Sequence, residues 1–124
     1  MDDASPSHWV WSSVPVEPVL PGITRQVVHG ERQSMVRYVY QPGSVFPLHR
    51  HPEEQITLVV AGRIAFEIDG RHLELGPGEV AVIPANMAHG ARALGEGAVE
   101  TYNALSPRRA ASPVVVSTEA DIRG

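Results

Sequence analysis

The chain has 124 residues and a mass of 13.4 kDa, enough for one domain with a modest core and too few for two. Its net charge of -4, with 10 basic against 14 acidic residues, gives no reason to expect a nucleic acid partner. Cysteine is absent, which excludes disulfides, zinc–thiolate sites and thiol catalysis and leaves histidine, carboxylate or amide groups to hold any metal. No run approaches the roughly 20 apolar residues of a membrane helix, so we expect a cytoplasmic protein that does not contact a membrane.

Residues 1–21 are expected to form a proline-rich arm. Prolines at positions 15, 18 and 21 favour an extended, polyproline-like segment over a core strand. Trp9 and Trp11 lie two residues apart in this arm and share one face of it. Two interpretations of the pair stay open: they dock on a partner subunit, or they cover the open end of their own barrel.

Pro-Gly pairs divide the next segment, residues 22–107, into short pieces. Each pair suits a type II turn, because proline presets the first central position and glycine supplies a positive φ at the second. The pieces between the turns contain apolar, β-branched runs of strand length, at 23–28, 35–40, 56–60, 80–83 and 98–104. No piece predicts a long helix. The predicted fold class is therefore all-β, an antiparallel sandwich or a barrel whose closure removes vulnerable sheet edges.

A hairpin is predicted around Asp69-Gly70, a sequence that favours a two-residue type I′ turn. The turn sets the register, in which the opposed pairs are Ile68 with Arg71, Glu67 with His72, Phe66 with Leu73, and Ile64 with Leu75. Glu67 and His72 therefore lie together on the more polar face, away from any pocket that Phe66 lines.

The last segment, residues 108–124, is expected to be a separate tail. It contains a β-like run at 114–116 in a polar, alanine-rich setting. Arg108 and Arg109 are interpreted as a solvated pair, and we assign no chemistry to the tail.

The heptad HRHPEEQ, residues 49–55, is the first stretch that predicts chemistry. His49 and His51 are two residues apart in an extended segment, so their side chains leave the same face from α-carbons about 6.5 to 7 Å apart. Two imidazoles in this arrangement can converge on one metal ion. Pro52 cannot donate a ladder hydrogen bond, so we expect the strand to end there.

A new strand is expected to begin at residue 55 or 56, and its alternation defines two faces. The more polar face, which suits a ligand-lined interior, carries Gln55, Thr57 and Val59. The other face carries Ile56, Leu58 and Val60.

A third histidine, His89, follows a strand and a short loop, and with it two stretches of the chain resemble the motifs of the cupin family. The first motif, a glycine, five residues, His-x-His, three or four residues, a glutamate, six residues and a glycine, resembles GSVFPLHRHPEEQITLVVAG, residues 43–62. The second, a glycine, five residues and Pro-x-Gly-x-x-His, resembles GEVAVIPANMAH, residues 78–89. This resemblance covers residues 22–107 and implies a small jelly-roll-like β-barrel with one metal ion inside it, usually in a homodimer.

Gln55 stands where the first cupin motif has a glutamate ligand. Small cupins with a His-x-His-Pro-x-Glu-Gln motif use the glutamine as a ligand, and the resemblance carries that role to Gln55. These cupins include proteins similar to the enzymes that linearise unsaturated uronates and to the cyclases of aromatic polyketides. The alternative is a pocket-lining amide that hydrogen-bonds the metal ligands. The resemblance implies one divalent transition metal per chain, Zn, Ni, Fe, Mn or Co, held by His49, His51, Gln55 and His89.

The charge of this ligand set favours one kind of chemistry. Three neutral imidazoles and a neutral amide leave a divalent ion at its full +2 charge, whereas a glutamate would reduce it. Such an ion is a stronger Lewis acid, suited to polarising a carbonyl or lowering the pKa of water. The ligand set therefore favours lyase, isomerase or cyclase chemistry over oxidation.

Two further residues are candidates for catalysis, Asn103 and Arg37. In the uronate-linearising cupins, the position that matches Asn103 carries an aspartate acting as the acid-base group. Asparagine cannot shuttle a proton in that role, so either the reaction differs or a water activated by the metal is the base. Arg37 either points into the barrel, where it would clamp a substrate carboxylate, or lies on the surface with its neighbours in the strand turned inward.

The sequence thus predicts a metal-dependent small cupin, an enzyme of non-redox type that acts on an oxygenated small molecule. Two other functions stay open. One is a non-catalytic binding or sensor barrel, and the other is an iron-dependent dioxygenase.

Overall fold

The computed structural model describes residues 5–109 and 114–115 of the chain. Within them lie one short 3-10 helix, η1 (Trp11–Ser13), and strands that are all antiparallel to their neighbours. The strands are β1 (Glu17–Leu20), β2 (Ile23–His29), β3 (Ser34–Tyr40), β4 (Val45–Arg50), β5 (Glu54–Ala61), β6 (Arg63–Ile68), β7 (Arg71–Leu75), β8 (Val80–Ile83), β9 (His89–Leu94), β10 (Val99–Ser106) and β11 (Val114–Val115). No helix among these residues is long and apolar enough to cross a membrane.

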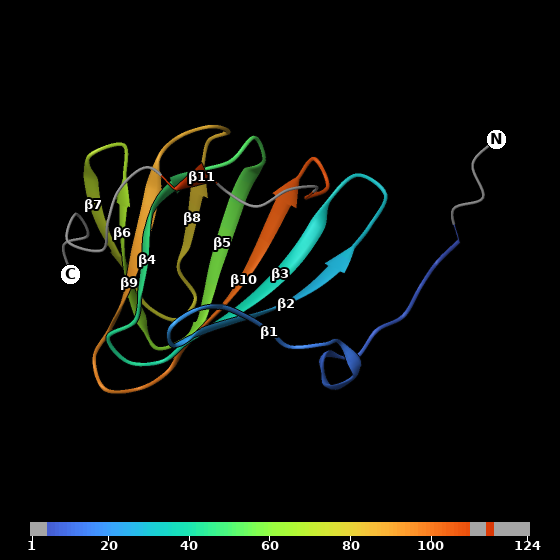
Figure 1. Cartoon of the computed structure of the whole chain (residues 1–124), viewed down its shortest axis with the longest axis horizontal. Helices are drawn as coiled ribbons and strands as arrows, with labels where there is room; N and C mark the ends of the chain where they lie inside the picture. Colours follow the sequence, from blue (N-terminus) through green and yellow to red (C-terminus); the bar gives the residue numbers. More distant parts are fainter. Residues whose placement is uncertain (1–4, 110–113, 116–124) are drawn as a thin grey trace.

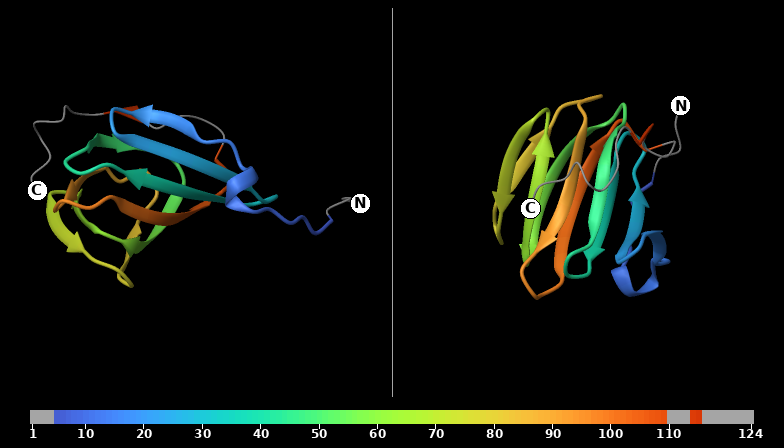
Figure 2. Two further views of the ribbon diagram at one scale, coloured as in Figure 1. Left: turned by 90° about the horizontal axis from the view of Figure 1, so that it is seen from below. Right: turned by 60° about the vertical axis from the view of Figure 1, so that its left-hand side comes forward.

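Two sheets curve around a common interior (Figures 1 and 2). The six-stranded sheet has the order β1-β2-β3-β10-β5-β8, and the five-stranded sheet has the order β11-β4-β9-β6-β7. Burial alternates along β3, β5 and β10, the pattern of strands with one face in the core and the other outward. One apolar cluster fills the interior between the sheets, with members that include Ile23, Val59, Phe66 and Leu105. The all-β prediction is confirmed.

The apolar runs of the sequence locate most of the strands. The runs at 23–28, 35–40, 56–60 and 80–83 fall within β2, β3, β5 and β8, and the run at 98–104 begins one residue before β10. On β5 the expected polar face, with Gln55, Thr57 and Val59, is buried in the interior. The face with Ile56, Leu58 and Val60 is exposed. Two-residue alternation therefore predicts correctly which side chains of β5 point inward.

The β6–β7 hairpin has the register that its turn predicts. Ile64 pairs with Leu75, Phe66 with Leu73, Glu67 with His72 and Ile68 with Arg71. Asp69 and Gly70 have φ angles of 49° and 77°, the left-handed conformation that a type I′ turn requires at both central positions.

The N-terminal arm is shorter than expected, because its last residues join a sheet. Glu17–Leu20 form β1, which pairs with β2 at the edge of the six-stranded sheet, although an extended arm was expected up to residue 21. Pro18 is compatible with this position, because an edge strand leaves one side of its backbone unpaired. The start of the described arm, residues 5–10, projects away from the barrel (Figure 1), whereas Val14 is buried and Gln26 of β2 donates to the carbonyls of Trp11 and Val14. The Trp11 ring stacks on Tyr102 of β10, while Trp9 is 57% exposed.

The tail also contributes a strand. Val114–Val115 form β11 and pair with His49 and Arg50 of β4, so this part of the tail lies beside the strand that carries the first candidate ligand. Val116, the last residue of the predicted β-like run, lies outside the described residues.

Candidate metal centre

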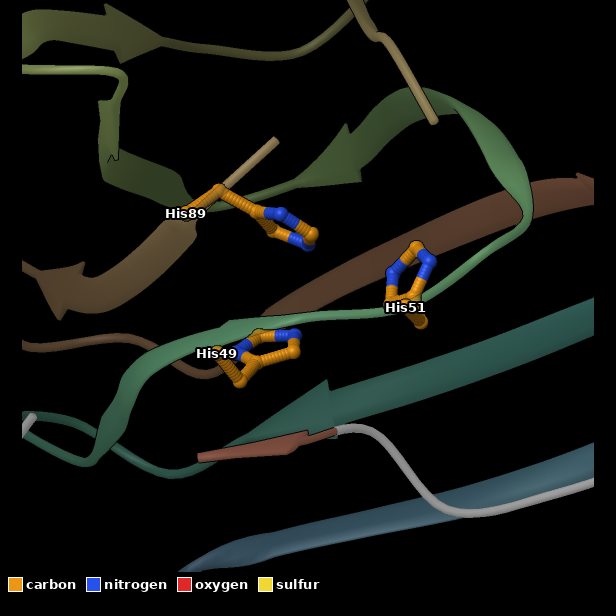
Figure 3. Close-up of side chains that lie close together, drawn as sticks. All are labelled: His49, His51 and His89. Carbon is orange, nitrogen blue, oxygen red and sulfur yellow. The ribbon is translucent and has the colours of Figure 1, made fainter. Parts of the chain in front are cut away.

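Three histidines meet inside the barrel, as their spacing in the two motifs predicts (Figure 3). His49 is near the end of β4, His51 follows that strand, and His89 opens β9 directly opposite His49. All three are buried, and a nitrogen of each ring lies within 4.8 Å of a nitrogen of the other two. The chain turns after His51, whose backbone carbonyl accepts a hydrogen bond of 2.8 Å from the Asn86 amide. Asn86 has a φ of 63°, the left-handed conformation expected for the residue that replaces a motif glycine.

The three rings are oriented in the same way. In each ring Nδ1 faces a backbone carbonyl, that of Pro47 at 2.8 Å for His49, of Glu53 at 3.0 Å for His51 and of Met87 at 2.9 Å for His89. A carbonyl only accepts, so Nδ1 of each neutral ring carries the proton and Nε2 keeps its lone pair. Nε2 of His89 is buried and has no hydrogen-bond partner among the described residues. Three lone pairs directed into one buried space fit a metal ion.

Burial keeps the three rings neutral. It lowers the pKa of His49 to about 3 and that of His89 to about 4, and in His49 the nearby His89 lowers it further. Burial also lowers the pKa of His51, with a further contribution from the charge of Arg109. At neutral pH all three rings are therefore unprotonated at one nitrogen, the form that binds a metal.

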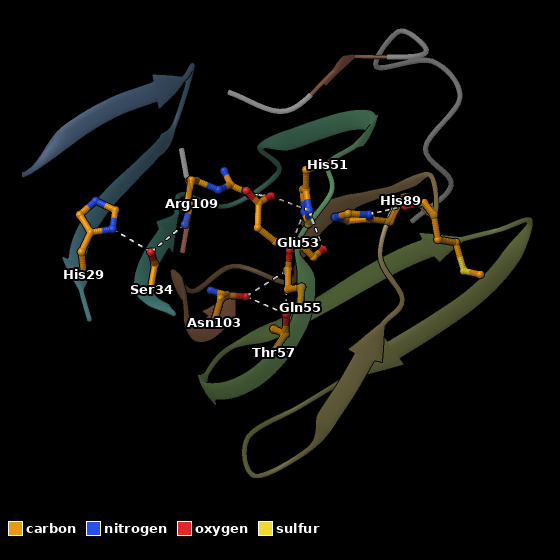
Figure 4. A network of polar contacts seen from close by, with 10 residues as sticks. His29, Ser34, His51, Glu53, Gln55, Thr57, His89, Asn103 and Arg109 are labelled. Carbon is orange, nitrogen blue, oxygen red and sulfur yellow. Dashed lines mark hydrogen bonds and ion pairs between the residues drawn. The ribbon is translucent and has the colours of Figure 1, made fainter. Parts of the chain in front are cut away.

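Gln55 turns its amide oxygen toward the histidines. Its Oε1 lies 3.0 Å from Nε2 of His51, and its Nε2 donates to Thr57 Oγ1 at 2.9 Å and to Asn103 Oδ1 at 3.2 Å (Figure 4). The orientation follows from Val36, whose backbone carbonyl can only accept and therefore faces the amide nitrogen of Asn103, at 3.0 Å. Asn103 must then present its oxygen to Gln55, and Gln55 must present its own oxygen to His51.

This arrangement leaves two acceptors in contact. The single proton of neutral His51 is on Nδ1, so its Nε2 faces the Gln55 oxygen with no hydrogen between them. A cation between the two atoms would remove the conflict, since both are ordinary metal ligands. The residues present thus fit a divalent metal held by His49, His51, His89 and Gln55.

Asn103 and Arg37, the two candidates for catalysis, lie on opposite faces of the six-stranded sheet. Asn103 is buried inside the barrel and contacts Gln55 and Thr57. Arg37 lies on the outer face, where its Nε donates to Glu100 Oε2 at 2.7 Å and its Nη1 donates to Gln26 Oε1. Of the two orientations left open for Arg37, the outward one is therefore observed, and its neighbours Val36, Tyr38 and Tyr40 are buried instead.

A different arginine lines the site. Arg109 was expected to be solvated with Arg108, but its side chain is only 9% exposed, and its guanidinium lies near the histidines (Figure 4). Its backbone amide donates to Ser34 Oγ at 3.0 Å, which holds the segment after β10 against β3. Nε and Nη1 of Arg109 are buried and have no hydrogen-bond partner among the described residues. A buried cationic group with free donors is typical of a binding site for an anion.

The pocket beside the histidines is mostly aromatic. Its lining consists of Tyr38, Tyr40, Phe46, His49, Gln55, Phe66, His89, Gly90, Ala91 and Arg109. Burial raises the pKa of the Tyr40 phenol, which therefore keeps its proton at neutral pH. No carboxylate is among these lining residues, so Arg109 is the charged side chain that a ligand in the pocket meets.

Comparison with known proteins agrees with this geometry. A family model described as a cupin domain matches residues 36–104. The chain is similar to the structure of KdgF from Halomonas sp., with 32% sequence identity and a TM-score of 0.78 over 85% of this chain and 96% of that chain. No match was found among curated proteins.

Two further structures share the fold at lower identity. An RmlC-like cupin from Shewanella frigidimarina is 23% identical, with a TM-score of 0.77 over 85% of this chain and 94% of that chain. A two-residue deletion mutant of oxalate decarboxylase OxdC from Bacillus subtilis is 21% identical, with a TM-score of 0.78 over 93% of this chain and 34% of that chain. The family model covers more than half of the chain, and the matched range includes all three histidines of the site. The chain therefore belongs to the cupin family.

Proposed function

We propose that this cupin is a metal-dependent enzyme of non-redox type, a lyase, isomerase or cyclase, that acts on an oxygenated small molecule carrying an anionic group. The observation that supports it is the combination in one pocket of a neutral three-histidine and amide donor set with the guanidinium of Arg109, whose Nε and Nη1 have no hydrogen-bond partner among the described residues. When bound, a divalent ion of the Zn, Ni, Fe, Mn or Co type supplies a Lewis acid for a carbonyl or hydroxyl oxygen.

The side chains of the pocket have separate tasks in this proposal. Arg109 binds the anionic group, most simply a carboxylate, through the donors that have no partner in the described structure. Phe46 and Phe66 make the wall apolar and exclude water, which strengthens these polar contacts. Tyr40, whose phenol stays neutral, donates a hydrogen bond to a substrate oxygen. Asn103 acts on the substrate only through Gln55, because its other hydrogen bonds are with Thr57, Thr101 and the Val36 carbonyl and it does not line the pocket.

Metal content of the purified protein tests the first half of the proposal. Protein expressed without a histidine tag should contain close to one divalent ion per chain, measured by elemental analysis. His89→Ala should be nearly empty, because it removes a buried ligand, whereas His8→Ala removes an exposed histidine of the arm and should leave the content unchanged. An empty wild-type protein would contradict the proposal.

A substrate screen tests the second half. The metal-loaded protein is incubated with carbonyl and uronate-like carboxylic acids, beside their neutral esters or amides. Turnover of the acids should require the metal and should fall by at least about 100-fold in Arg109→Gln, as expected for loss of a charge-assisted contact of about 3 kcal/mol. Oxygen consumption by the Fe(II) form would instead indicate a dioxygenase, and tight binding without turnover would indicate a binding or sensor protein.

We also propose that the protein is a homodimer, formed through the outer face of β5 and β8. What supports this is an apolar surface of five aliphatic side chains that are at least one third exposed, Ile56, Leu58, Val60, Val80 and Val82. A contiguous exposed apolar patch is a common mark of a protein–protein contact.

A further inference from the structure

Glu53 is a buried acid beside the metal site that belongs to no role assigned so far. It precedes β5 and is 2% exposed, whereas its neighbour Glu54 is exposed. Its carboxylate Oε1 lies 3.3 Å from Nδ1 of His51 and 3.8 Å from Nη2 of Arg109 (Figure 4). Glu53 does not line the pocket, and it approaches His51 on the side of the ring away from Nε2. It is therefore not placed to touch a substrate or the metal.

The burial of this carboxylate needs compensation. A buried charge is costly unless an opposite charge or hydrogen bonds stabilise it, and Oε1 has no hydrogen-bond partner among the described residues. The proton on Nδ1 of His51 is already donated to the backbone carbonyl of Glu53 at 3.0 Å. The guanidinium of Arg109 is the cation that the carboxylate meets, and Arg109 is in turn buried with unpaired donors. Each group thus balances the charge of the other.

Glu53 also contacts His51 through two groups, its backbone carbonyl and its side-chain carboxylate. Its backbone carbonyl and its carboxylate both lie at the Nδ1 edge of the ring, which fixes the ring plane and places the lone pair of Nε2 toward the other histidines. A carboxylate at this edge raises the electron density of the imidazole and its strength as a ligand.

We infer that Glu53 is a positioning residue shared by the two halves of the site: it holds His51 for the metal and Arg109 for the anionic substrate. This inference rests on the proposed function, because it assigns the supporting contacts of the same site. It predicts that one carboxylate outside the pocket controls metal affinity.

The adjacent glutamates give a matched pair of variants. Glu53→Gln and Glu54→Gln change the same chemical group at neighbouring positions, one buried and one exposed. Zinc affinity is measured for both by competition with a chromophoric chelator at fixed pH. We expect Glu53→Gln to bind zinc about 10- to 100-fold more weakly than wild type, the usual effect of losing a group that supports a metal-bound histidine. Glu54→Gln should stay within about twofold of wild type, since it alters only a solvated charge.

A second measurement separates positioning from simple packing. In the metal-free protein, Glu53→Gln leaves Arg109 buried without a counter-charge and should lower the thermal midpoint by several degrees. Adding Arg109→Met should restore part of this loss, so the two changes are not additive. A residue that only fills space would show no such rescue.

The outcomes distinguish the inference from the proposed function. Equal zinc affinities for the two glutamate variants, together with additive thermal shifts, would overturn the role of Glu53 while leaving the metal site intact. A wild-type protein that binds no zinc or other divalent ion would overturn the proposed function, and the thermal shifts would still decide whether Glu53 holds Arg109.

Discussion

A single backbone carbonyl determines which atom of Gln55 faces the three histidines. Val36 on β3 accepts from Asn103 on β10, which orients Gln55 on β5. This relay of hydrogen bonds, from Val36 through Asn103 to Gln55, needs three neighbouring strands, and β10 lies between the other two. An aspartate at position 103 would lack the donor that Val36 requires. This gives a physical reason for asparagine at 103 in this chain.

The variant Asn103→Asp should therefore destabilise the protein. The side chain is 2% exposed and donates to Val36 O at 3.0 Å and to Thr101 Oγ1 at 2.9 Å, so a carboxylate would face a carbonyl with no proton between them. We expect a loss of about 2 kcal/mol in the free energy of unfolding, the usual cost of an unsatisfied buried polar group.

Urea denaturation of the metal-free protein at pH 7.5 measures this loss. Acid provides an internal control, because burial raises the pKa of an aspartate and the protonated form recovers a donor. The difference from wild type should shrink as the pH falls toward 5. A variant as stable as wild type at pH 7.5 would show that the relay does not orient the amides.

Some of the site could be predicted from single residues and some could not. Spacing within the motifs identifies the three histidines, and strand alternation places Asn103 inside the barrel. The orientation of Arg37 could not be predicted, because both faces of β3 carry apolar residues. Alternation alone therefore does not show which face is turned into the barrel. Arg109 was missed because its neighbour Arg108 has the same local sequence pattern, and its burial depends on Ser34 and Glu53, which are distant in sequence.

At the scale of elements, the β6–β7 hairpin could be predicted in full, because its turn and its alternation agree. The edge strand β1 could not be predicted from the sequence. Proline argues against a central strand but tolerates an edge, and the sequence does not indicate which strands end a sheet. Local patterns therefore predict strands and hairpins, whereas the position of a strand in its sheet depends on the rest of the chain.

The outer face of the β6–β7 hairpin carries a cluster of ionisable side chains whose contribution to stability depends on pH. His72 on β7 contacts Glu67 of β6 through Nδ1 and Glu74 through Nε2 at 3.0 Å, and Arg63 also contacts Glu74. Hydrogen bonds to Glu74 and then to Glu67 raise the pKa of His72. The bond to His72, and then that to Arg63, lowers the pKa of Glu74. The raised His72 pKa gives stability that is complete below about pH 6.5 and is lost as the pH rises through the folded-state pKa.

The variant His72→Gln tests whether the stability contributed by His72 is lost as the pH rises. It should lower the thermal midpoint by a few degrees near pH 6 and by less at pH 9, where wild-type His72 has lost its charge. At still lower pH the contribution of the His72 contacts to stability should fall again. Glu74 is then protonated, which happens below the pH at which an ordinary glutamate takes up its proton, because its pKa is lowered. Thermal unfolding across pH 4 to 9, with His8→Gln as the exposed control, measures the window. A difference from wild type that is constant with pH would attribute the effect to packing.

At the scale of the whole molecule, the outer face of β5 and β8 is apolar and exposed. The face of β5 and β8 pairs apolar side chains across the strands, Ile56 with Val82 and Leu58 with Val80, and β8 is also the edge of its sheet. An exposed apolar edge is an aggregation hazard unless another surface covers it. A stable dimer buries roughly 800 Å² per partner, more than five half-exposed aliphatic side chains supply, so a second surface must contribute. The projecting arm, with Trp9 57% and Val10 53% exposed, offers two apolar side chains for this contact.

A lysine in this face should therefore dissociate the proposed dimer. Val82 is 57% exposed, so Val82→Lys puts a charge into the interface without disturbing the interior of the barrel. Sedimentation or light scattering across a concentration series should give a dimer for wild type and a monomer for this variant, at unchanged metal content. Met35→Lys, at a residue 40% exposed on β3 and separated from β5 by β10, is the matched control and should remain dimeric. A dimer that survives Val82→Lys but not Met35→Lys would place the interface on the β3 side of the sheet, and a monomeric wild type would contradict the dimer itself.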